Sequence, residues 1–242
     1  MMRLVIGNKS YSSWSMRPWV LMRQAGIAFD EQVIRFDSFA PDSAFKRALA
    51  RLTPVGKVPV LIDDAVQLDG RPLAIWDTLA IAEYLAERFP EHRLWPDDAA
   101  ERARARSVCA EMHAGFTALR SNCPMNLDGQ VNDAKTMAAA GARIWSEQAG
   151  VRADVARLVQ MWSELLQAHG GPLLFGRFTI ADAYFAPVCT RLRTYGLPVA
   201  DEIARYIDAV FALPGAAAWI EQALAEHEFL DFEEPYRRRA VP

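Results

Sequence analysis

The sequence predicts an α/β domain followed by an all-α domain, and three observations lead to this fold class. Short apolar runs with strand character alternate with amphipathic helical segments over residues 1–90. Charged residues and two prolines then interrupt this pattern near residues 91–97. From residue 98 onward, alanine, leucine and arginine dominate, and the periodic segments have helical spacing. We therefore predict domains at residues 1–90 and 98–242, joined by a linker at 91–97.

The first domain is expected to have the element order βαβαββα. Its apolar residues alternate between the two-residue period of strands and the longer period of helices. Asp69-Gly70 is typical of a hairpin turn, and Pro41 with Asp42 and Ser43 precedes a helix. The expected elements are a strand at 3–7, a helix at 14–25, a strand at 29–36, a helix at 41–52, a strand at 57–63, a hairpin at 65–76 and a helix at 77–89.

The second domain is expected to contain helices only, because none of its segments shows the alternation of a strand. The clearest helical segments lie at residues 111–120, 151–169, 179–196 and 200–227. Residues 122–150 have the weakest periodicity, and "CPMNLDGQVND" at 123–133 is predicted to be a loop.

Composition and charge exclude several function classes. A net charge of −3 provides no surplus of cations for phosphates, so we expect no nucleic-acid partner. No run approaches the roughly 18 apolar residues of a membrane span, and the N-terminus does not resemble a signal peptide. Four histidines without paired spacing predict no metal, and Arg237–Arg239 is typical of a solvated tail. Cys109, Cys123 and Cys189 are scattered, which favours reduced thiols and a cytoplasmic location.

"TPVGKVPVL" places a proline where a strand begins. A cis bond between Val58 and Pro59 would turn the chain and expose the N–H and C=O of Val58 at a strand edge. An extended peptide would then pair with that edge. An edge-strand proline without any ligand explains the same residues equally well.

"IWDTLAIAEYL" places Asp77 and Thr78 at the start of an amphipathic helix. The free N–H groups there, together with Thr78, are suited to a carboxylate, and Asp77 is suited to an ammonium group. Because Asp and Thr are also ordinary helix caps, the two residues taken alone favour a plain N-cap.

"TIADAYF" contains Thr179 and Asp182 at the spacing of a capping box, with Phe178 or Ile180 as a hydrophobic staple. We interpret this motif as structural and assign it no chemistry.

"NKSYSSWSMR" raises the question of why several serines stand where a strand becomes a helix. A thiolate is the reactive form of a thiol, and most free thiols are protonated at neutral pH. A hydroxyl at a helix N-terminus offers a thiolate both a hydrogen bond and the positive end of the helix dipole. Ser12, Ser13 and Ser15 are therefore candidates for activating the thiol of a bound peptide.

Together these segments resemble the cytosolic glutathione transferases, over nearly the whole chain. "SSWSMR" resembles the "SSCSxR" signature of the zeta class, and "TPVGKVPVL" resembles its "NPxxxVPxL". "DT" corresponds to a Glu/Gln-Ser pair, and "TIADA" matches the capping box of the family. The resemblance implies a thioredoxin-like first domain, an all-α second domain and glutathione as co-substrate.

The resemblance also implies roles for individual residues. Ser12 would stabilise the thiolate, with Ser13 and Ser15 as alternates, and Arg17 would form a structural ion pair. The other implied glutathione-binding residues each contact one part of the tripeptide. Val58 with Pro59 would pair with the cysteinyl backbone, and Asp77 with Thr78 would bind the γ-glutamyl group. Lys46 or Lys57 would bind the glycyl carboxylate. In this chain Trp14 replaces the cysteine of the zeta signature, Asp77 is shorter than the usual Glu or Gln, and Ala44 replaces a polar residue.

The electrophile site implied by the resemblance lies where the two domains meet. Its candidates are Trp14, His113, Phe116, Arg120, Asn122, Met125 and Asn126. The aromatic and methionine side chains favour an apolar co-substrate, whereas the arginines favour an anionic one. His113 taken alone is more often an ordinary helix residue than a catalytic one.

Three functions follow from this interpretation. The first is a glutathione transferase that conjugates electrophiles or reduces peroxides. The second is a glutathione-dependent cis–trans isomerase of the maleylacetoacetate type, and the third is a non-catalytic binding module with the same fold.

A homodimer is also expected from the resemblance. Arg102, Arg104 and Arg106 of one subunit would meet acidic residues of the other, although a solvated charged helix explains the same arginines. The acidic candidates are Asp63, Asp64 and Asp69.

Overall fold

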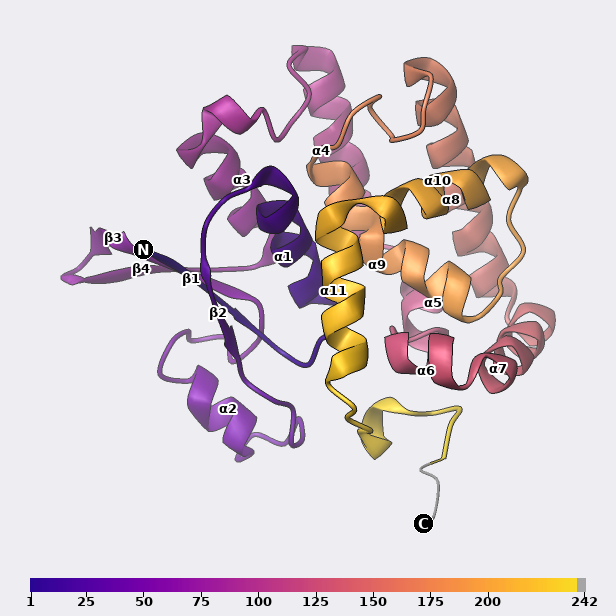
Figure 1. Ribbon diagram of the computed structural model, residues 1–242, viewed down its shortest axis with the longest axis horizontal. Coiled ribbons are helices and arrows are strands. Elements are labelled where there is room, and N and C mark those ends of the chain that lie inside the picture. The colour runs from indigo at the N-terminus through magenta and orange to yellow at the C-terminus, as the bar shows by residue number, and fades with distance from the viewer. Residues whose placement is uncertain (239–242) are drawn as a thin grey trace.

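Four strands form one mixed sheet in the computed structural model, which describes residues 1–238 (Figure 1). The strands are β1 (Met2–Ile6), β2 (Asp30–Val33), β3 (Val60–Leu68) and β4 (Arg71–Trp76). Their order in the sheet is β2-β1-β3-β4, with β1 parallel to β2 and antiparallel to β3. Helices α1 (Ser13–Ala25), α2 (Ala44–Leu49) and α3 (Thr78–Arg88) complete the first domain. The predicted order βαβαββα is confirmed.

The hairpin of β3 and β4 begins earlier than the sequence predicts. Residues 60–68 form one strand rather than a short strand followed by a separate hairpin arm. A shift in register between Asp63 and Gln67 absorbs the extra residues, so that pairing with β4 resumes at Gln67. The predicted turn at Asp69-Gly70 is present, with φ angles of 51° and 73°. A left-handed turn of this kind follows the twist of the two strands.

Both faces of the sheet are covered, which explains why β1 is continuously apolar. Leu4 and Ile6 belong to a core shared with α1, α3 and the second domain. Val5 points to the opposite face, where it packs with Phe45 and Leu49 of α2. Helix α1 therefore lies between the sheet and the second domain, where α9 and α11 pack against it (Figure 1).

The second domain is all-α, as predicted. Its helices are α4 (Ala99–Ala114), α5 (Thr117–Asn122), α6 (Leu127–Asn132), α7 (Ala134–Glu147), α8 (Ala149–His169), α9 (Ile180–Thr194), α10 (Asp201–Ala212) and α11 (Pro214–Ala225). Two short 3-10 turns, Pro90–His92 and Asp231–Glu233, flank the domain. Helix α9 is buried along nearly its whole length and forms the centre of the domain.

Three local predictions in this domain are wrong. The helix expected at 111–120 is interrupted, because α4 ends at Ala114 with Gly115 as its C-cap, and Phe116 has a left-handed backbone. The loop expected at 123–133 contains α6, which the Asn126 side chain caps by accepting from the Gly129 N–H at 2.7 Å. The helix expected at 200–227 is two helices with a 77° bend, since Pro214 begins α11.

The capping box of α9 is confirmed. Asp182 accepts a hydrogen bond from the Thr179 N–H at 2.9 Å and a second from the Leu174 N–H at 3.1 Å. Its side chain is fully buried, and burial raises its pKa to about 6. The motif therefore ties the start of α9 to the preceding loop.

The segment after α11 returns to the first domain. Glu226 accepts from the Lys9 N–H at 2.9 Å, and Glu234 accepts from the Tyr11 hydroxyl at 2.7 Å. Arg237 is buried and paired with Asp128 at 2.7 Å, so the prediction of a solvated tail is wrong for this residue. Arg238 is exposed, and Arg239 lies outside the described residues.

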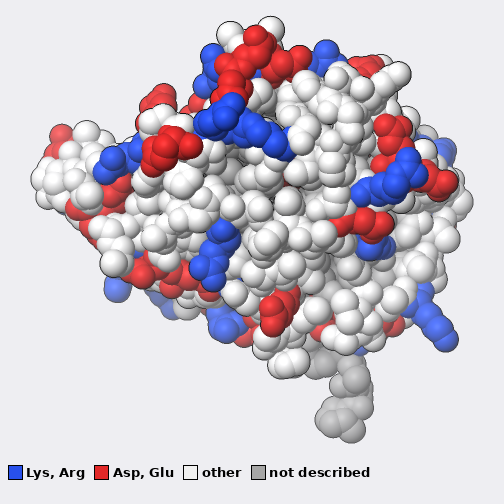
Figure 2. Space-filling model, turned by 45° about the horizontal axis from the view of Figure 1, so that its top comes forward, with Lys and Arg blue, Asp and Glu red and all other residues white. Residues whose placement is uncertain are grey.

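Acidic and basic side chains are interspersed on the face shown in Figure 2. In residues 1–238 no single helix has the length and apolarity of a membrane span, although the bent pair α10–α11 meets that criterion jointly. Within the same residues, no group of three or more His, Cys, Asp or Glu side chains is arranged to hold a metal ion.

Candidate functional site

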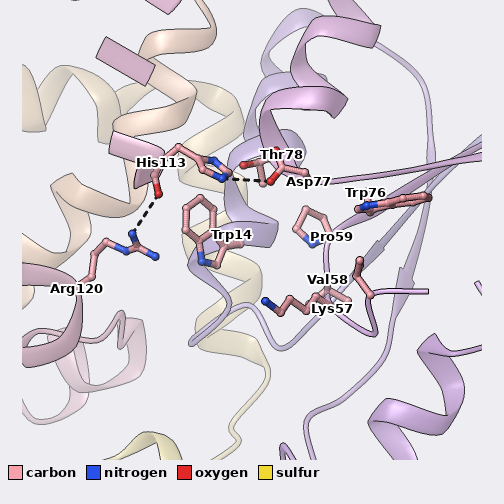
Figure 3. A pocket seen from close by; sticks show the side chains of 10 residues that line it. Trp14, Lys57, Val58, Pro59, Trp76, Asp77, Thr78, His113 and Arg120 are labelled. Atoms are coloured by element: carbon pink, nitrogen blue, oxygen red, sulfur yellow. Dashed lines mark hydrogen bonds and ion pairs between the residues drawn. The ribbon is translucent and has the colours of Figure 1, made fainter. Parts of the chain in front are cut away.

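Three adjoining pockets lie where the first domain meets the second, and Trp14 lines all of them. The strand-edge pocket, about 370 Å³, is formed by Trp14, Val55, Lys57, Val58, Pro59, Trp76, Asp77, Thr78, His113 and Arg120 (Figure 3). The serine pocket, about 380 Å³, is formed by Tyr11, Ser12, Ser13, Trp14, Phe36, Phe39, Phe45, Lys46, Lys57, Val58 and Glu233. The arginine pocket, about 420 Å³, is formed by Tyr11, Ser13, Trp14, Thr117, Arg120, Ser121, Pro124, Met125, Arg191 and Glu233.

The serines occupy the start of α1, and each has a different environment. Ser12 is the N-cap residue, and its hydroxyl donates to the Ser15 hydroxyl at 2.7 Å. Ser15 is fully buried behind it and also accepts from the Gly7 N–H at 3.2 Å. Ser13 accepts from Arg191 Nη2 at 3.0 Å. Ser12 and Ser13 therefore face the serine pocket, whereas Ser15 supports Ser12 from inside the fold.

The strand edge has the geometry that the sequence suggests. The bond between Val58 and Pro59 is cis, and no hydrogen bond from residues 1–238 occupies the N–H or the C=O of Val58. Val58 lines both the serine pocket and the strand-edge pocket. Lys57 is exposed beside it, and Lys46 Nζ donates to the Gly56 carbonyl at 2.8 Å.

Asp77 caps α3 and also reaches across to the second domain. Its Oδ1 accepts from the Leu79 N–H at 2.8 Å, and its Oδ2 lies 3.2 Å from His113 Nε2 (Figure 3). The backbone of Asp77 has a φ angle of 76°, which for a residue other than glycine costs on the order of 1–3 kcal/mol. Such strain is typical of functional sites, where the surrounding structure holds the residue in place.

A chain of hydrogen bonds continues from Asp77 through the domain interface. His113 Nδ1 lies 2.7 Å from the Tyr184 hydroxyl, and that hydroxyl lies 2.6 Å from Thr78 Oγ1. Burial raises the pKa of Tyr184 well above its ordinary value, so the phenol stays protonated. Tyr184 belongs to the "TIADAYF" motif, which we interpreted as purely structural. The motif therefore also positions Thr78 and His113.

Trp14 is held between two guanidinium groups. Arg17 lies 4.1 Å from the ring centroid and Arg120 lies 4.9 Å from it. Arg17 donates to the carbonyls of Tyr184 and Ser13, at 3.0 Å and 2.9 Å. The predicted ion pair of Arg17 is wrong, because no carboxylate of the described residues pairs with it. Burial lowers the pKa of Arg17 to about 9, so it remains charged at neutral pH.

Comparison with known proteins identifies the family. A profile described as the N-terminal domain of glutathione S-transferase matches residues 11–88. A second profile, described as the C-terminal domain of the same enzymes, matches residues 138–222, so the two together span more than half of the chain. The chain belongs to the glutathione S-transferase family. Its thioredoxin-like first domain and helical second domain are those of this fold.

Individual relatives of this glutathione S-transferase family member are distant. "Glutathione S-transferase 1" of Dianthus caryophyllus is 24% identical over 79% of this chain and 79% of its own length. "Stringent starvation protein A homolog" of Histophilus somni is 21% identical, covering 79% of this chain and 78% of its own. A solved glutathione transferase homolog from Burkholderia, with bound glutathione, has a TM-score of 0.64 and 23% identity, covering 94% and 99% of the two chains.

The predicted co-substrate residues of this family member divide into two groups. Trp14, His113, Arg120 and Met125 line the pockets. Phe116, Asn122 and Asn126 do not line them. Phe116 packs in the core, Asn122 donates to the Ala118 carbonyl, and Asn126 caps α6.

Sequence reasoning missed several residues that line the pockets. In the arginine pocket these are Tyr11, Thr117, Ser121, Pro124, Arg191 and Glu233, and in the other two pockets they include Phe36, Phe39, Phe45, Val55 and Trp76. Tyr11 directly precedes the serines, so its position in the sequence could have identified it. Arg191 and Glu233 come from distant segments that carry no local signal for this site.

Proposed function

We propose that the protein is a glutathione transferase that binds glutathione along the serine and strand-edge pockets and activates its thiol with the Ser12 hydroxyl. One observation carries the proposal. Ser12, the unpaired backbone of Val58 and the Asp77–Thr78 pair line two pockets that share Trp14, Lys57 and Val58. An extended tripeptide along this surface reaches all three features.

The proposed binding mode uses each group according to its chemistry. The backbone of Val58 pairs with the cysteinyl residue of glutathione in the manner of an added strand. Asp77 accepts from the α-ammonium group, and Thr78 with the N-terminal N–H groups of α3 binds the γ-glutamyl carboxylate. Lys46 or Lys57 is the cation available to the glycyl carboxylate.

The proposed chemistry needs little beyond positioning and thiolate stabilisation. The Ser12 hydroxyl turns from Ser15 toward the sulfur, and Ser15 donates to Ser12 in return. The thiol releases its proton to solvent, and the Ser12 hydroxyl stabilises the resulting thiolate. For an electrophile with a leaving group, the thiolate forms a sulfur–carbon bond, and the leaving group departs with its bonding electrons. Ser13 is the alternative donor, because Arg191 polarises its hydroxyl.

Two other functions and a cellular location are also proposed from the sequence and the comparisons. Reversible addition of the thiolate to a double bond, the zeta-type isomerisation, uses the same serines, but Trp14 stands in place of the zeta cysteine. Because one relative is named as a stringent starvation protein and not as a transferase, a binding module is the second candidate. We place the protein in the cytoplasm, with a role in electrophile detoxification, because its three free cysteines suit a reducing compartment.

Glutathione titration by calorimetry tests the proposal, together with conjugation of 1-chloro-2,4-dinitrobenzene. We expect saturable binding and turnover, with Asp77→Ala weakening binding about tenfold through the lost charge-assisted bond. Asp64→Ala, which removes an exposed carboxylate on β3, is the control and should change neither quantity. No binding at millimolar glutathione by the folded protein would favour the binding-module alternative.

A further inference from the structure

Three arginines surround Trp14 and Ser13 without a carboxylate partner. Arg17 and Arg191 are buried, with 3% and 6% of their surface exposed, and Arg120 is half-buried. Nine other arginines of residues 1–238 form ion pairs, whereas no carboxylate oxygen in this part of the chain lies within 4 Å of these three. A buried charge is costly unless a counter-charge accompanies it.

Neutral oxygens accept all of the hydrogen bonds that these guanidinium groups donate. Arg120 Nη1 donates to the carbonyls of His113 and Gly115, at 3.3 Å and 3.2 Å. Arg191 donates to the carbonyls of Cys123 and Arg120 and to the Ser13 hydroxyl, while its buried Nε has no partner within residues 1–238. Donors of Arg191 thus remain unsatisfied beside the arginine pocket.

The charges also act on one another. Burial and mutual repulsion lower the pKa of Arg191 to about 10, and burial lowers the pKa of Arg120. Both stay protonated at neutral pH, so the pocket carries a positive field. An anion that enters the pocket supplies the missing counter-charge.

One acidic side chain lines the arginine pocket. Glu233, from the segment after α11, lines this pocket and the serine pocket, and burial raises its pKa to about 7. The charged groups that face it are Arg191, Arg120, Glu234, Lys46 and Lys57. Its carboxylate is therefore only partly ionised at neutral pH and does not neutralise both arginines.

We propose that Arg120 and Arg191 bind an anionic group of the co-substrate, so that the preferred co-substrates are electrophiles bearing a carboxylate. This specificity rests on the proposed transferase function. The arginine pocket shares Ser13 and Trp14 with the serine pocket, so a carboxylate held by the arginines places the rest of a small electrophile beside the proposed thiolate. The planar guanidinium groups suit a carboxylate because they donate through a rigid fork.

A matched pair of electrophiles tests the specificity: 4-chloro-3-nitrobenzoate and its methyl ester. In both, the glutathione thiolate bonds to the carbon that carries chlorine, and chloride leaves with the bonding electrons. Each kcat/KM is divided by the rate of the uncatalysed reaction with glutathione, which corrects for the stronger activation by the ester. We expect the acid to be preferred by about tenfold or more, the range of one or two charge-assisted bonds.

Substitutions assign this preference to the arginines. Arg120→Met and Arg191→Met should remove it by lowering the normalised rate for the acid, with the ester changed less than about twofold. Arg191→Lys keeps the positive charge, and it is included in case Arg191→Met does not fold at this buried position. Arg157→Met, which removes an exposed arginine paired with Glu111, is the control and should retain the preference. Equal normalised rates for acid and ester in the parent protein would overturn the proposal.

Binding measurements separate this proposal from the transferase function. In calorimetry without glutathione, the protein should bind benzoate more tightly than benzamide, and Arg120→Met should abolish this difference in affinity. If no electrophile turns over but this difference is present, the anion site stands and the transferase function fails. If benzoate and benzamide bind equally, or if glutathione displaces benzoate competitively, the arginines do not serve a co-substrate.

Glu233 supplies a second readout through pH. Between about pH 6 and pH 8 its ionisation adds a negative charge to the pocket, so benzoate should bind more weakly as the pH rises. Glu233→Gln should bind benzoate more tightly at pH 8 and remove most of this dependence. A parent protein whose benzoate affinity does not change between these pH values would contradict the proposed pocket.

Discussion

Ser12 and Ser15 act as a pair of hydroxyls rather than as two independent candidates. Their oxygens are 2.7 Å apart, and only Ser12 lines a pocket. Because Ser15 is fully buried, we propose that it orients Ser12 through their shared hydrogen bond. Ser13 has a separate environment beside Arg191 and is the one competing donor in the cluster.

Ser12→Ala should lower kcat/KM with 1-chloro-2,4-dinitrobenzene by roughly ten- to a hundredfold, because one charge-assisted bond to the thiolate is lost. The melting temperature should change little, since Ser12 makes no cap bond to α1. Ser15→Ala should have a smaller effect on turnover. A larger loss in Ser13→Ala than in Ser12→Ala would transfer the role to Ser13.

His113 is a positioning residue for the proposed γ-glutamyl site. It contacts Asp77 through one ring nitrogen and Tyr184 through the other. His113→Ala should raise the KM for glutathione several-fold and leave kcat nearly unchanged. The substitution removes the contact that positions Asp77 and, through Tyr184, Thr78, but it removes no proposed contact to the sulfur of glutathione. Tyr184→Phe should shift the KM in the same direction. A loss confined to kcat would instead place His113 near the reacting atoms.

At the scale of the element, α9 shows how one motif serves both stability and the site. Its capping box anchors the helix start, and two turns of the same helix present Tyr184 and Arg191 to the domain interface. The helix is buried on nearly all sides, so its position depends on packing as well as on the cap. A substitution that weakens the capping box should therefore displace Tyr184 and Arg191.

Asp182→Ala should reduce the free energy of unfolding by about 2–5 kcal/mol, measured by urea denaturation at neutral pH. The substitution leaves the buried N–H groups of Thr179 and Leu174 without acceptors. Asp182→Asn keeps one acceptor oxygen, so it should reduce the free energy of unfolding by less than Asp182→Ala. Unchanged stability in the alanine variant would contradict the structural role of the capping box.

At the scale of the whole molecule, two segments connect the domains. Helix α1 is packed between the sheet and α9, and the segment after α11 returns to bind the loop that carries the serines. The second domain therefore holds the start of α1 from both sides. Activity in the proposed mechanism depends on this joint packing rather than on the first domain alone.

A homodimer remains a prediction, but its expected contacts change. Arg104 pairs with Glu164 and Arg106 pairs with Glu83 in the same chain. Asp63 is buried and accepts from the Tyr84 hydroxyl at 2.8 Å, so Asp64 and Asp69 are the acidic residues left exposed on the hairpin. Light scattering at micromolar concentration should give about twice the 27.1 kDa of one chain. A mass near that of one chain would exclude the dimer at this concentration.

Features that depend on neighbouring residues can be predicted from the amino-acid sequence. Periodicity predicts the order of strands and helices in the first domain and the helical nature of the second. Residue type and spacing also predict the turn at Asp69-Gly70 and the capping box at Asp182, whereas a cis bond is only one of the conformations that the sequence allows before Pro59. These features are set within a few residues of chain, where steric limits and local hydrogen bonds decide the conformation.

The distant residues that meet at the site are brought together by packing between elements, which the sequence does not reveal. Arg191 is 178 positions from Ser13, and no local pattern relates the two. The breaks after Gly115 and before Pro214, the helix at 127–132 and the arrival of Glu233 at the pocket likewise depend on packing between elements. Local sequence sets the backbone preference of each segment, whereas burial of the shared core decides how the segments are arranged and which charges are brought together.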